Sequence, residues 1–315
     1  MGAIELHAHL AAGDPTSVPP FMAALFDVER YLETQAAAGI DLTVLSNALT
    51  EVPSDGDELG EARKQHDFLA ETVAAHPDRF KALAGVNPFG GPEWLEEGER
   101  ALDAGLSGFV FPASREDRYL DEPEAQDAFA LAEERGALVF IHPAEAPVTA
   151  EQAGDPMLAM WIGRVYDTGI ALSRMLMADT LSRYPRLKVL VAHAGGVVPM
   201  MLGRLDQVHE TFKRRAAIQA RMGATATVTA LEPALDDPGP SARIDQLYLD
   251  TACYHPAAVA AAIAMVGPDR VVLGSDHPPV DQSPNASVEL ISSLEVDESV
   301  RDRILSTNAR ALLEI

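Results

Sequence analysis

The sequence predicts a closed (β/α)8 barrel of the TIM type, within the α/β class. Short apolar segments of strand character alternate along the whole chain with longer segments that carry a helical period. The strand segments are apolar at nearly every position, as in a parallel sheet that is covered on both faces. Eight such pairs fit into 315 residues, a usual length for one barrel. We therefore predict a single domain spanning residues 1–315.

The predicted strands share their apolar content and short length. They are expected at residues 3–10, 42–46, 80–86, 106–111, 137–141, 187–192, 246–250 and 270–274. Helices are expected at residues 26–38, 58–75, 94–104, 124–135, 168–183, 200–215 and 255–266, with helical sequence from there to residue 315. Three long connections follow strands, at 143–167, 216–243 and 278–287. Loops after the strands of such a barrel form its active site, although an oligomer contact explains 216–243 equally well.

The charge balance limits the partners. The 48 acidic and 24 basic residues give a net charge of −24, which repels phosphate backbones and anionic lipid, so we expect no nucleic-acid or membrane partner. We see no span-length apolar segment and no signal-peptide pattern, and Cys253 is the only cysteine, so we expect a cytoplasmic protein. The expected partner is a small-molecule substrate. The sequence leaves the oligomeric state open, with a homodimer as one option.

The opening strand carries two histidines on one face. Residues alternate between faces in a strand, so Glu5, His7 and His9 point one way. Two imidazoles two residues apart can bind the same cation. Alone, the pair is equally consistent with surface histidines on an edge strand.

Three more strands end in a residue that can bind a metal. These residues are His142, His193 and Asp276, each followed within three residues by proline or glycine. Strand exits surround one opening of a barrel, so all three should meet His7 and His9 there. Each has a structural explanation alone, but together they favour a site. His66, His76 and His209 lie in helical sequence and are expected to be solvated, whereas His255 could line the pocket or begin a helix.

Several of these segments, in this order, resemble the amidohydrolase superfamily. The resemblance is to its amidohydrolase 2 branch, which contains α-amino-β-carboxymuconate-ε-semialdehyde decarboxylase and aromatic-acid decarboxylases. It covers nearly the whole chain and rests on residues 5–9, 141–143, 184–189, 192–196, 203–204, 274–276 and 308–310.

The resemblance implies one divalent metal ion. Zinc is the usual metal of the family, with manganese as the alternative. The ligands it implies are His7, His9, His142 and Asp276. It also implies that His193 is the acid/base beside a metal-bound water. From the chemistry of such a site, Asp276 or His193 can accept a proton. The fourth strand ends at Phe111-Pro112 without the lysine that bridges two metals in many relatives, so one ion is the consistent count.

The resemblance also bears on the substrate. Arg204 matches an arginine that binds a substrate carboxylate in the named decarboxylase. A second such arginine is missing, because no lysine or arginine occurs between Leu10 and Glu29, so we expect a smaller and less anionic substrate. Trp161 and Phe111 could offer flat apolar surface to it, and burial in the core explains them equally well.

Two reaction types use such a site. Zinc lowers the pKa of bound water toward roughly 7. The resemblance favours decarboxylation of a small aromatic or unsaturated carboxylic acid, and hydrolysis of a lactone, ester or amide is the alternative. A metal-binding barrel without catalysis is disfavoured because His193 and Asp276 are both present. Glu5 is expected to orient a ligand ring by contacting the second nitrogen of that ring, and a buried salt bridge to an unidentified cation is the alternative.

Overall fold

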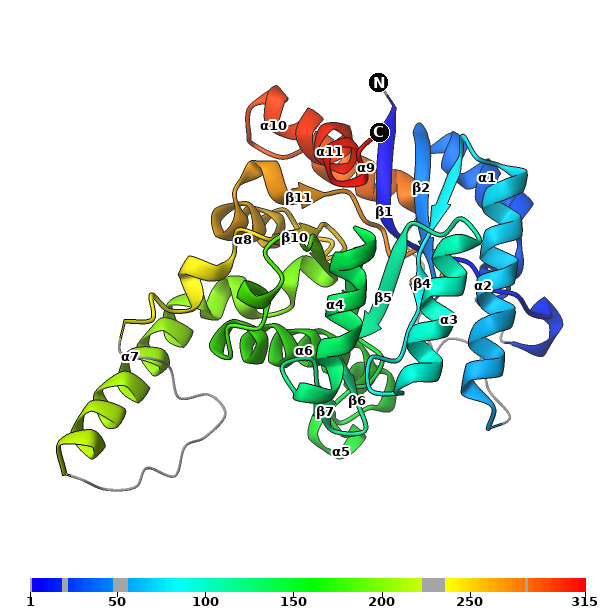
Figure 1. Ribbon diagram of the computed structural model, residues 1–315. Helices are drawn as coiled ribbons and strands as arrows, with labels where there is room; N and C mark the ends of the chain where they lie inside the picture. The colour runs from blue at the N-terminus through cyan, green and yellow to red at the C-terminus, as the bar shows by residue number, and fades with distance from the viewer. Residues whose placement is uncertain (1, 19–21, 48–55, 223–235, 281–282) are drawn as a thin grey trace.

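The computed structural model describes residues 2–18, 22–47, 56–222, 236–280 and 283–315 (Figure 1). Its barrel strands are all parallel to their neighbours, and Leu83 interrupts the third, which is assigned as two strands. In chain order they are β1 (Ala3–His9), β2 (Ile40–Ser46), β3 (Phe80–Ala82) with β4 (Ala84–Gly85), β5 (Gly108–Pro112), β8 (Leu138–His142), β9 (Val189–Val191), β10 (Leu247–Asp250) and β11 (Val271–Val272).

Backbone hydrogen bonds close these strands into a ring. The strand order is β1-β2-β3 in one sheet and β11-β10-β9-β8-β5-β4 in the other. The first and last strands meet where Leu6 N donates to Leu273 O at 2.8 Å. The two sheets are continuous through the third strand, where Ser107 N donates to Ala82 O at 2.8 Å. The predicted (β/α)8 barrel is confirmed.

Helices surround the strands. They are α1 (Val28–Ala37), α2 (Glu58–Ala75), α3 (Pro92–Asp103), α4 (Gln126–Arg135), α5 (Ala150–Ala153), α6 (Pro156–Met177), α7 (Val198–Met222), α8 (Pro256–Val266), α9 (Pro284–Ser292), α10 (Glu298–Asp302) and α11 (Asn308–Leu313). Aspartates begin several of them, since Asp27, Asp57 and Asp155 accept hydrogen bonds from the first turns of α1, α2 and α6. In the described part of the chain, no helix combines the length and apolar character that crossing a membrane requires.

The packing of β8 shows how a strand delivers a functional side chain. All five of its residues are buried. Val139 and Ile141 pack in the larger apolar cluster, and Leu138 and Phe140 in the smaller one. Because side chains alternate along a strand, His142 shares the face of Phe140, and their rings lie 5.6 Å apart. A buried aromatic ring therefore packs beside the histidine at the strand exit.

The long connections differ from the sequence-based expectation. The loop expected at 143–167 contains the short helix α5 and is helical again from Pro156, where Asp155 caps α6 and proline suits its first turn. This helix, α6, also ends earlier than expected, at Met177. The helix α7 continues through Met222, and the rest of the expected loop up to 235 lies outside the described residues. An unforeseen hairpin of β6 (Ser114–Arg115) and β7 (Arg118–Tyr119) follows β5.

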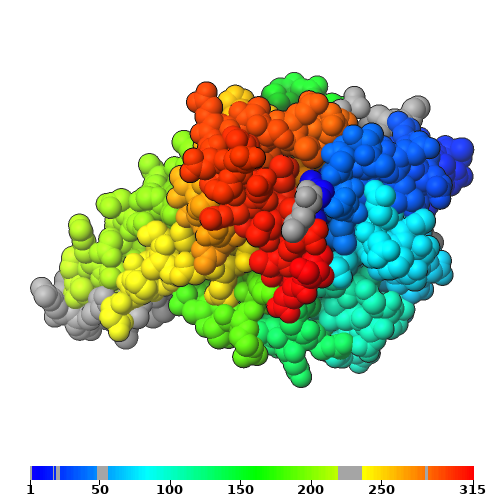
Figure 2. Space-filling model, turned by 90° about the horizontal axis from the view of Figure 1, so that it is seen from above, coloured from blue at the N-terminus to red at the C-terminus, as the bar shows by residue number. Residues whose placement is uncertain are grey.

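The barrel body is not symmetric. Figure 1 shows α7 running outward from it, and Figure 2 shows the same green and yellow part of the chain as a projection. The chain begins with β1 in the barrel wall, and α11 at the other end of the chain lies close to it.

Candidate metal centre

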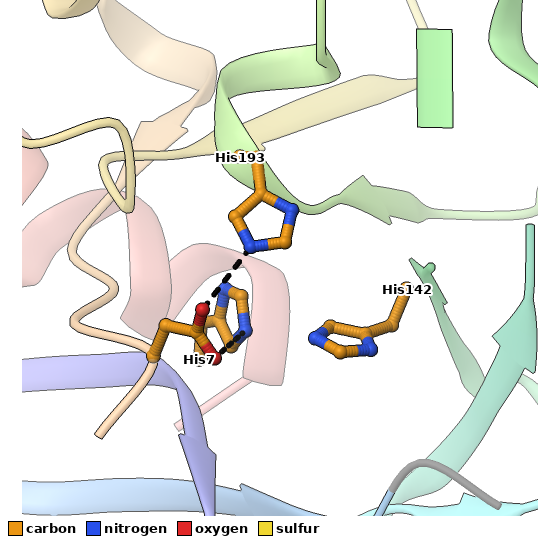
Figure 3. A group of neighbouring side chains, drawn as sticks. His7, His142 and His193 are labelled. Atoms are coloured by element: carbon orange, nitrogen blue, oxygen red, sulfur yellow. Dashed lines mark hydrogen bonds and ion pairs between the residues drawn. The ribbon is translucent and has the colours of Figure 1, made fainter. Parts of the chain in front are cut away.

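Side chains from four strand exits converge on one point (Figure 3). One ligand atom each from His7, His142, His193 and Asp276 lie within 4.8 Å of one another. His9 joins them, since its Nε2 lies 3.2 Å from His7 Nε2 and 3.0 Å from Asp276 Oδ1. The five residues that the sequence placed around one opening are therefore neighbours, although this proximity does not divide them into ligands and acid/base.

Asp276 is the charged centre of this group. Its Oδ1 lies 3.2 Å from His7 Nε2, and its Oδ2 lies 3.2 Å from His193 Nε2. Burial alone would raise the pKa of this carboxyl, but His7 and the other imidazoles hold it well below its usual range. Asp276 is therefore a carboxylate, and each of its oxygens faces an imidazole.

His142 has a different environment. Both of its ring nitrogens are buried and have no hydrogen-bond partner among the described residues. Burial, followed by the neighbouring imidazoles, lowers its pKa well below the usual range, so the ring is neutral. An unsatisfied buried nitrogen costs about 1–3 kcal/mol. The neutral His142 ring has one nitrogen with a free lone pair, and a divalent cation would bind it. Several imidazoles together with one carboxylate form a donor set that zinc and manganese accept.

His193 reaches the cluster through an unusual turn. The residue has φ 54° and Ala194 has φ 55°, both in the left-handed region, and two glycines with positive φ follow. His193 is 8% exposed, and its ring Nδ1 is buried without a hydrogen-bond partner among the described residues. The histidine therefore lies at the edge of the cluster, with Nε2 directed at Asp276.

Asp250, at the end of β10, supports two members of the cluster at once. His7 Nδ1 donates to Asp250 Oδ2 at 2.5 Å, and both side chains are fully buried. Asp250 Oδ1 accepts from the backbone of Ala194 at 3.0 Å and of Ala252 at 3.1 Å. Burial alone would lower the pKa of His7, but the carboxylates of Asp276 and Asp250 raise it to about 10. The sequence analysis missed Asp250, although its place at a strand exit was the signal that identified the other residues.

Comparison with known proteins agrees with this geometry. The model of the family described as "Amidohydrolase" matches residues 4–315. The chain belongs to the amidohydrolase family. This confirms the resemblance seen in the sequence, including its branch, because the relatives found are decarboxylases of that kind.

The relatives of this amidohydrolase are distant in sequence. A 2-amino-3-carboxymuconate-6-semialdehyde decarboxylase of Dictyostelium discoideum is 27% identical over 82% of the chain and 67% of the relative. A γ-resorcylate decarboxylase of a Rhizobium strain is 24% identical over 90% of the chain and 86% of the relative. Both were matched over most of their length, and both names describe carboxy-lyases.

Solved structures share the fold of the amidohydrolase. A 2,6-dihydroxybenzoate decarboxylase solved with 2,6-dihydroxybenzoate aligns over the full length of both chains, with a TM-score of 0.79 and 22% identity. A 5-carboxyvanillate decarboxylase of Novosphingobium aromaticivorans, solved with manganese, has a TM-score of 0.81 and 20% identity over 99% of this chain and 96% of its own. At these identities the likeness establishes the fold alone.

Two further residues of the amidohydrolase bear on the centre. Tyr254 OH lies 3.5 Å from Asp276 Oδ2 and donates to Ser275 O at 3.2 Å. The sequence offered no signal for it, because its position after β10 has no motif. Glu5 is fully buried, and its Oε2 accepts from Tyr31 at 2.8 Å and Thr43 at 3.2 Å. The expected role of Glu5 in orienting a ligand ring therefore stays a prediction, while Asp250 makes that contact.

The residues predicted to contact the substrate differ in their exposure. Arg204 is exposed on α7, and Trp161 is 45% exposed on α6. Phe111 is fully buried in the larger apolar cluster, which favours its structural explanation. The roles of Arg204 and Trp161 in substrate binding stay predictions.

Three other histidines can now be assigned. His255 is exposed and begins α8, since its Nδ1 accepts from Ala257 N at 3.1 Å. His66 and His209 were expected to be solvated, and this is wrong, because they are 2% and 1% exposed. His66 Nδ1 donates to Glu97 at 2.6 Å and Nε2 to Gly85 O at 3.1 Å, so a buried acceptor pair explains its position.

Proposed function

We propose that this amidohydrolase decarboxylates a small aromatic or unsaturated carboxylic acid with the help of one divalent metal ion. The observation that carries the proposal is the convergence of four histidines and one aspartate at the strand exits of a barrel whose relatives are decarboxylases. We treat the chain as one catalytic domain.

We assign the ion to His7, His9, His142 and Asp276. The unpartnered nitrogens of His142 and the carboxylate of Asp276 support this assignment. Zinc is our first choice for this donor set, and manganese, which occurs in three of the related structures, is the alternative. When bound, the ion would polarise the acid and lower the pKa of a bound water.

We assign proton transfer to His193. Decarboxylation breaks the bond between the carboxylate and a carbon of the substrate, and the electron pair left on that carbon must take up one proton. His193 Nε2 lies at the edge of the cluster, 3.2 Å from Asp276 Oδ2, where a carboxylate can hold the imidazolium that delivers this proton. After this transfer His193 is neutral, and a proton from solvent would restore its imidazolium beside the Asp276 carboxylate.

We expect a substrate with one carboxylate. The protein carries a net charge of −24, so it does not attract polyanions over long distances. Its first connection offers no lysine or arginine between Leu10 and Glu29 for a second carboxylate. A hydroxylated benzoate satisfies these limits.

Turnover tests the proposal directly. Purified protein loaded with zinc or manganese is incubated with salicylate, resorcylates and a set of lactones, esters and amides. We expect release of carbon dioxide from an aromatic acid, and in D2O one deuterium should appear at the carbon that lost the carboxylate. Hydrolysis of a lactone or amide without any decarboxylation would refute the proposal and favour the alternative function.

A further inference from the structure

The metal centre is most accessible at Asp276 and His193. The side chains of these two residues are 14% and 9% exposed, whereas His7 and His9 are fully buried and His142 is 2% exposed. Asp276 Oδ2 faces His193 Nε2 at 3.2 Å. A substrate that reaches the centre therefore approaches it beside Asp276 Oδ2.

Tyr254 lies at this accessible side of the centre. It follows β10, is partly exposed, and its hydroxyl lies 3.5 Å from the same Asp276 Oδ2. Its second contact is the backbone carbonyl of Ser275, at 3.2 Å. Both contacts are long, because a well-formed hydrogen bond from a hydroxyl to an oxygen spans about 2.7–2.8 Å. Among the described residues, this hydroxyl is therefore a donor without a close acceptor.

The backbone of Tyr254 has a conformation that tyrosine rarely adopts. Its φ of 56° lies in the left-handed region, which suits glycine or asparagine better than a bulky side chain. The turn is held on one side by Ala252 N, which donates to Asp250 Oδ1 at 3.1 Å. On the other side, His255 caps the start of α8. Such residues persist where the surrounding structure fixes them and gather at functional sites, so the outlier points to a use for the tyrosine side chain.

The turn that holds Tyr254 is also joined to the strand exit that carries Asp276. Thr251 Oγ1 accepts from Gly274 N at 3.1 Å and donates to Gly274 O at 3.3 Å. Asp276 follows Gly274 by two residues. The Tyr254 hydroxyl is therefore fixed relative to the centre before a substrate arrives, which lowers the cost of forming a contact with it.

We propose that the Tyr254 hydroxyl donates a hydrogen bond to the carboxylate of the substrate. This inference rests on the proposed function, which supplies the acid, and it adds a residue that selects for one carboxylate. Within the described residues, the other side chains that pair with Asp276 are all imidazoles, which are assigned to the metal or to proton transfer. Tyr254 is the donor that remains for a substrate oxygen. Its hydroxyl is neutral, so it does not supply the positive charge that a second carboxylate would require.

Binding of benzoate to the zinc-loaded protein tests this contact. Tyr254→Phe removes the hydroxyl and keeps the ring. We expect calorimetry to show a dissociation constant for benzoate that is at least about tenfold higher, because a hydrogen bond to a charged group is lost. The affinity for phenol, which has no carboxylate, should not change. The matched control is Tyr184→Phe, since Tyr184 is also partly exposed but its hydroxyl donates to Gln126 O at 3.0 Å.

Metal affinity and kinetics separate this role from mere support of Asp276. A hydroxyl that only held Asp276 in place would be needed for tight zinc binding and for kcat. We expect Tyr254→Phe to bind zinc as the wild type does in chelator competition. With an acid that the enzyme decarboxylates, KM should rise and kcat should stay unchanged, because the contact is made to the bound acid and does not strengthen as carbon dioxide leaves.

Three results would overturn the inference. They are equal benzoate affinity in Tyr254→Phe and the wild type, an equally large loss of phenol binding, and weaker zinc binding in the variant. A wild-type protein that binds no benzoate would overturn the inference together with the proposed function. A wild type that binds benzoate but decarboxylates none of the tested acids would count against the proposed function alone, and the binding comparison would still decide the role of Tyr254.

Discussion

Replacing Asp250 with asparagine alters the support of the metal centre without changing its shape. Asp250 can only accept, so His7 must carry a proton on Nδ1, and its Nε2 is left to face the cluster. In asparagine, the oxygen that accepts from Ala194 and Ala252 can stay in place, but the amide nitrogen then faces His7 Nδ1 as a donor. His7 would have to move its proton to Nε2, the nitrogen assigned to the metal.

The cost follows from these contacts. Turning the amide around would restore the acceptor for His7, but it would remove the two backbone hydrogen bonds from Ala194 and Ala252, each worth about 1 kcal/mol. Keeping them leaves His7 in the wrong tautomer, and changes to partners of metal ligands cost about 10-fold to 100-fold in affinity. Both routes cost about 2–3 kcal/mol, so we expect metal affinity to fall by on the order of 100-fold.

Chelator competition measures this affinity for zinc and manganese. The matched control is Asp121→Asn, which removes a nearly buried carboxylate from its ion pair with Arg174 and should leave affinity unchanged. NMR titration of the metal-free protein gives a second readout. The pKa of His7 should fall below its value of about 10, because one of the two carboxylates that raise it is lost. A folded Asp250→Asn variant with wild-type metal affinity would refute the reasoning.

Three further predictions concern the site and the stability of the barrel. His142→Ala should lose bound metal and activity together. His193→Asn should keep its metal, and its turnover should fall by on the order of 100-fold or more. Elemental analysis measures the bound metal, and equal metal loss in both variants would place His193 among the ligands. Arg204→Lys should raise KM for an aromatic acid although the charge is kept, and Arg204→Met should raise it more; wild-type kinetics in both would make Arg204 structural. Burial alone would raise the pKa of Glu97, but hydrogen bonds from His66 and Arg100 lower it to about 2. Its stabilisation, at most about 3 kcal/mol, is therefore present above pH 4.5 and lost as the pH falls toward 2. In the Glu97→Gln variant, the free energy of unfolding should change less between pH 4.5 and pH 2 than it does in the wild type. An unchanged pH dependence in this range would contradict the prediction.

Much of the fold and of the centre could be predicted from local sequence. Parallel strands that are covered on both faces must be apolar throughout, so 137–141 and 187–192 were recognisable as strands without any knowledge of their neighbours. Their number then required a barrel, and a barrel brings its strand exits together. This is why His142, His193 and Asp276 could be grouped with the opening histidines before any distance was known.

Tertiary structure decided how these groups pair. Asp250 and His7 are 243 residues apart, and no periodicity indicates which carboxylate at a strand exit accepts from which ring. The burial of His66 had the same origin, because a helical period does not reveal that Glu97 from another helix will cover the histidine. Helix ends differed from the prediction for another reason. The apolar period predicts a helix from residue 168, but the Asp155 cap begins α6 at Pro156, twelve residues earlier. Local propensity and periodicity act within one element, whereas hydrogen-bond partners and exposed faces depend on elements that only the folded barrel brings into contact.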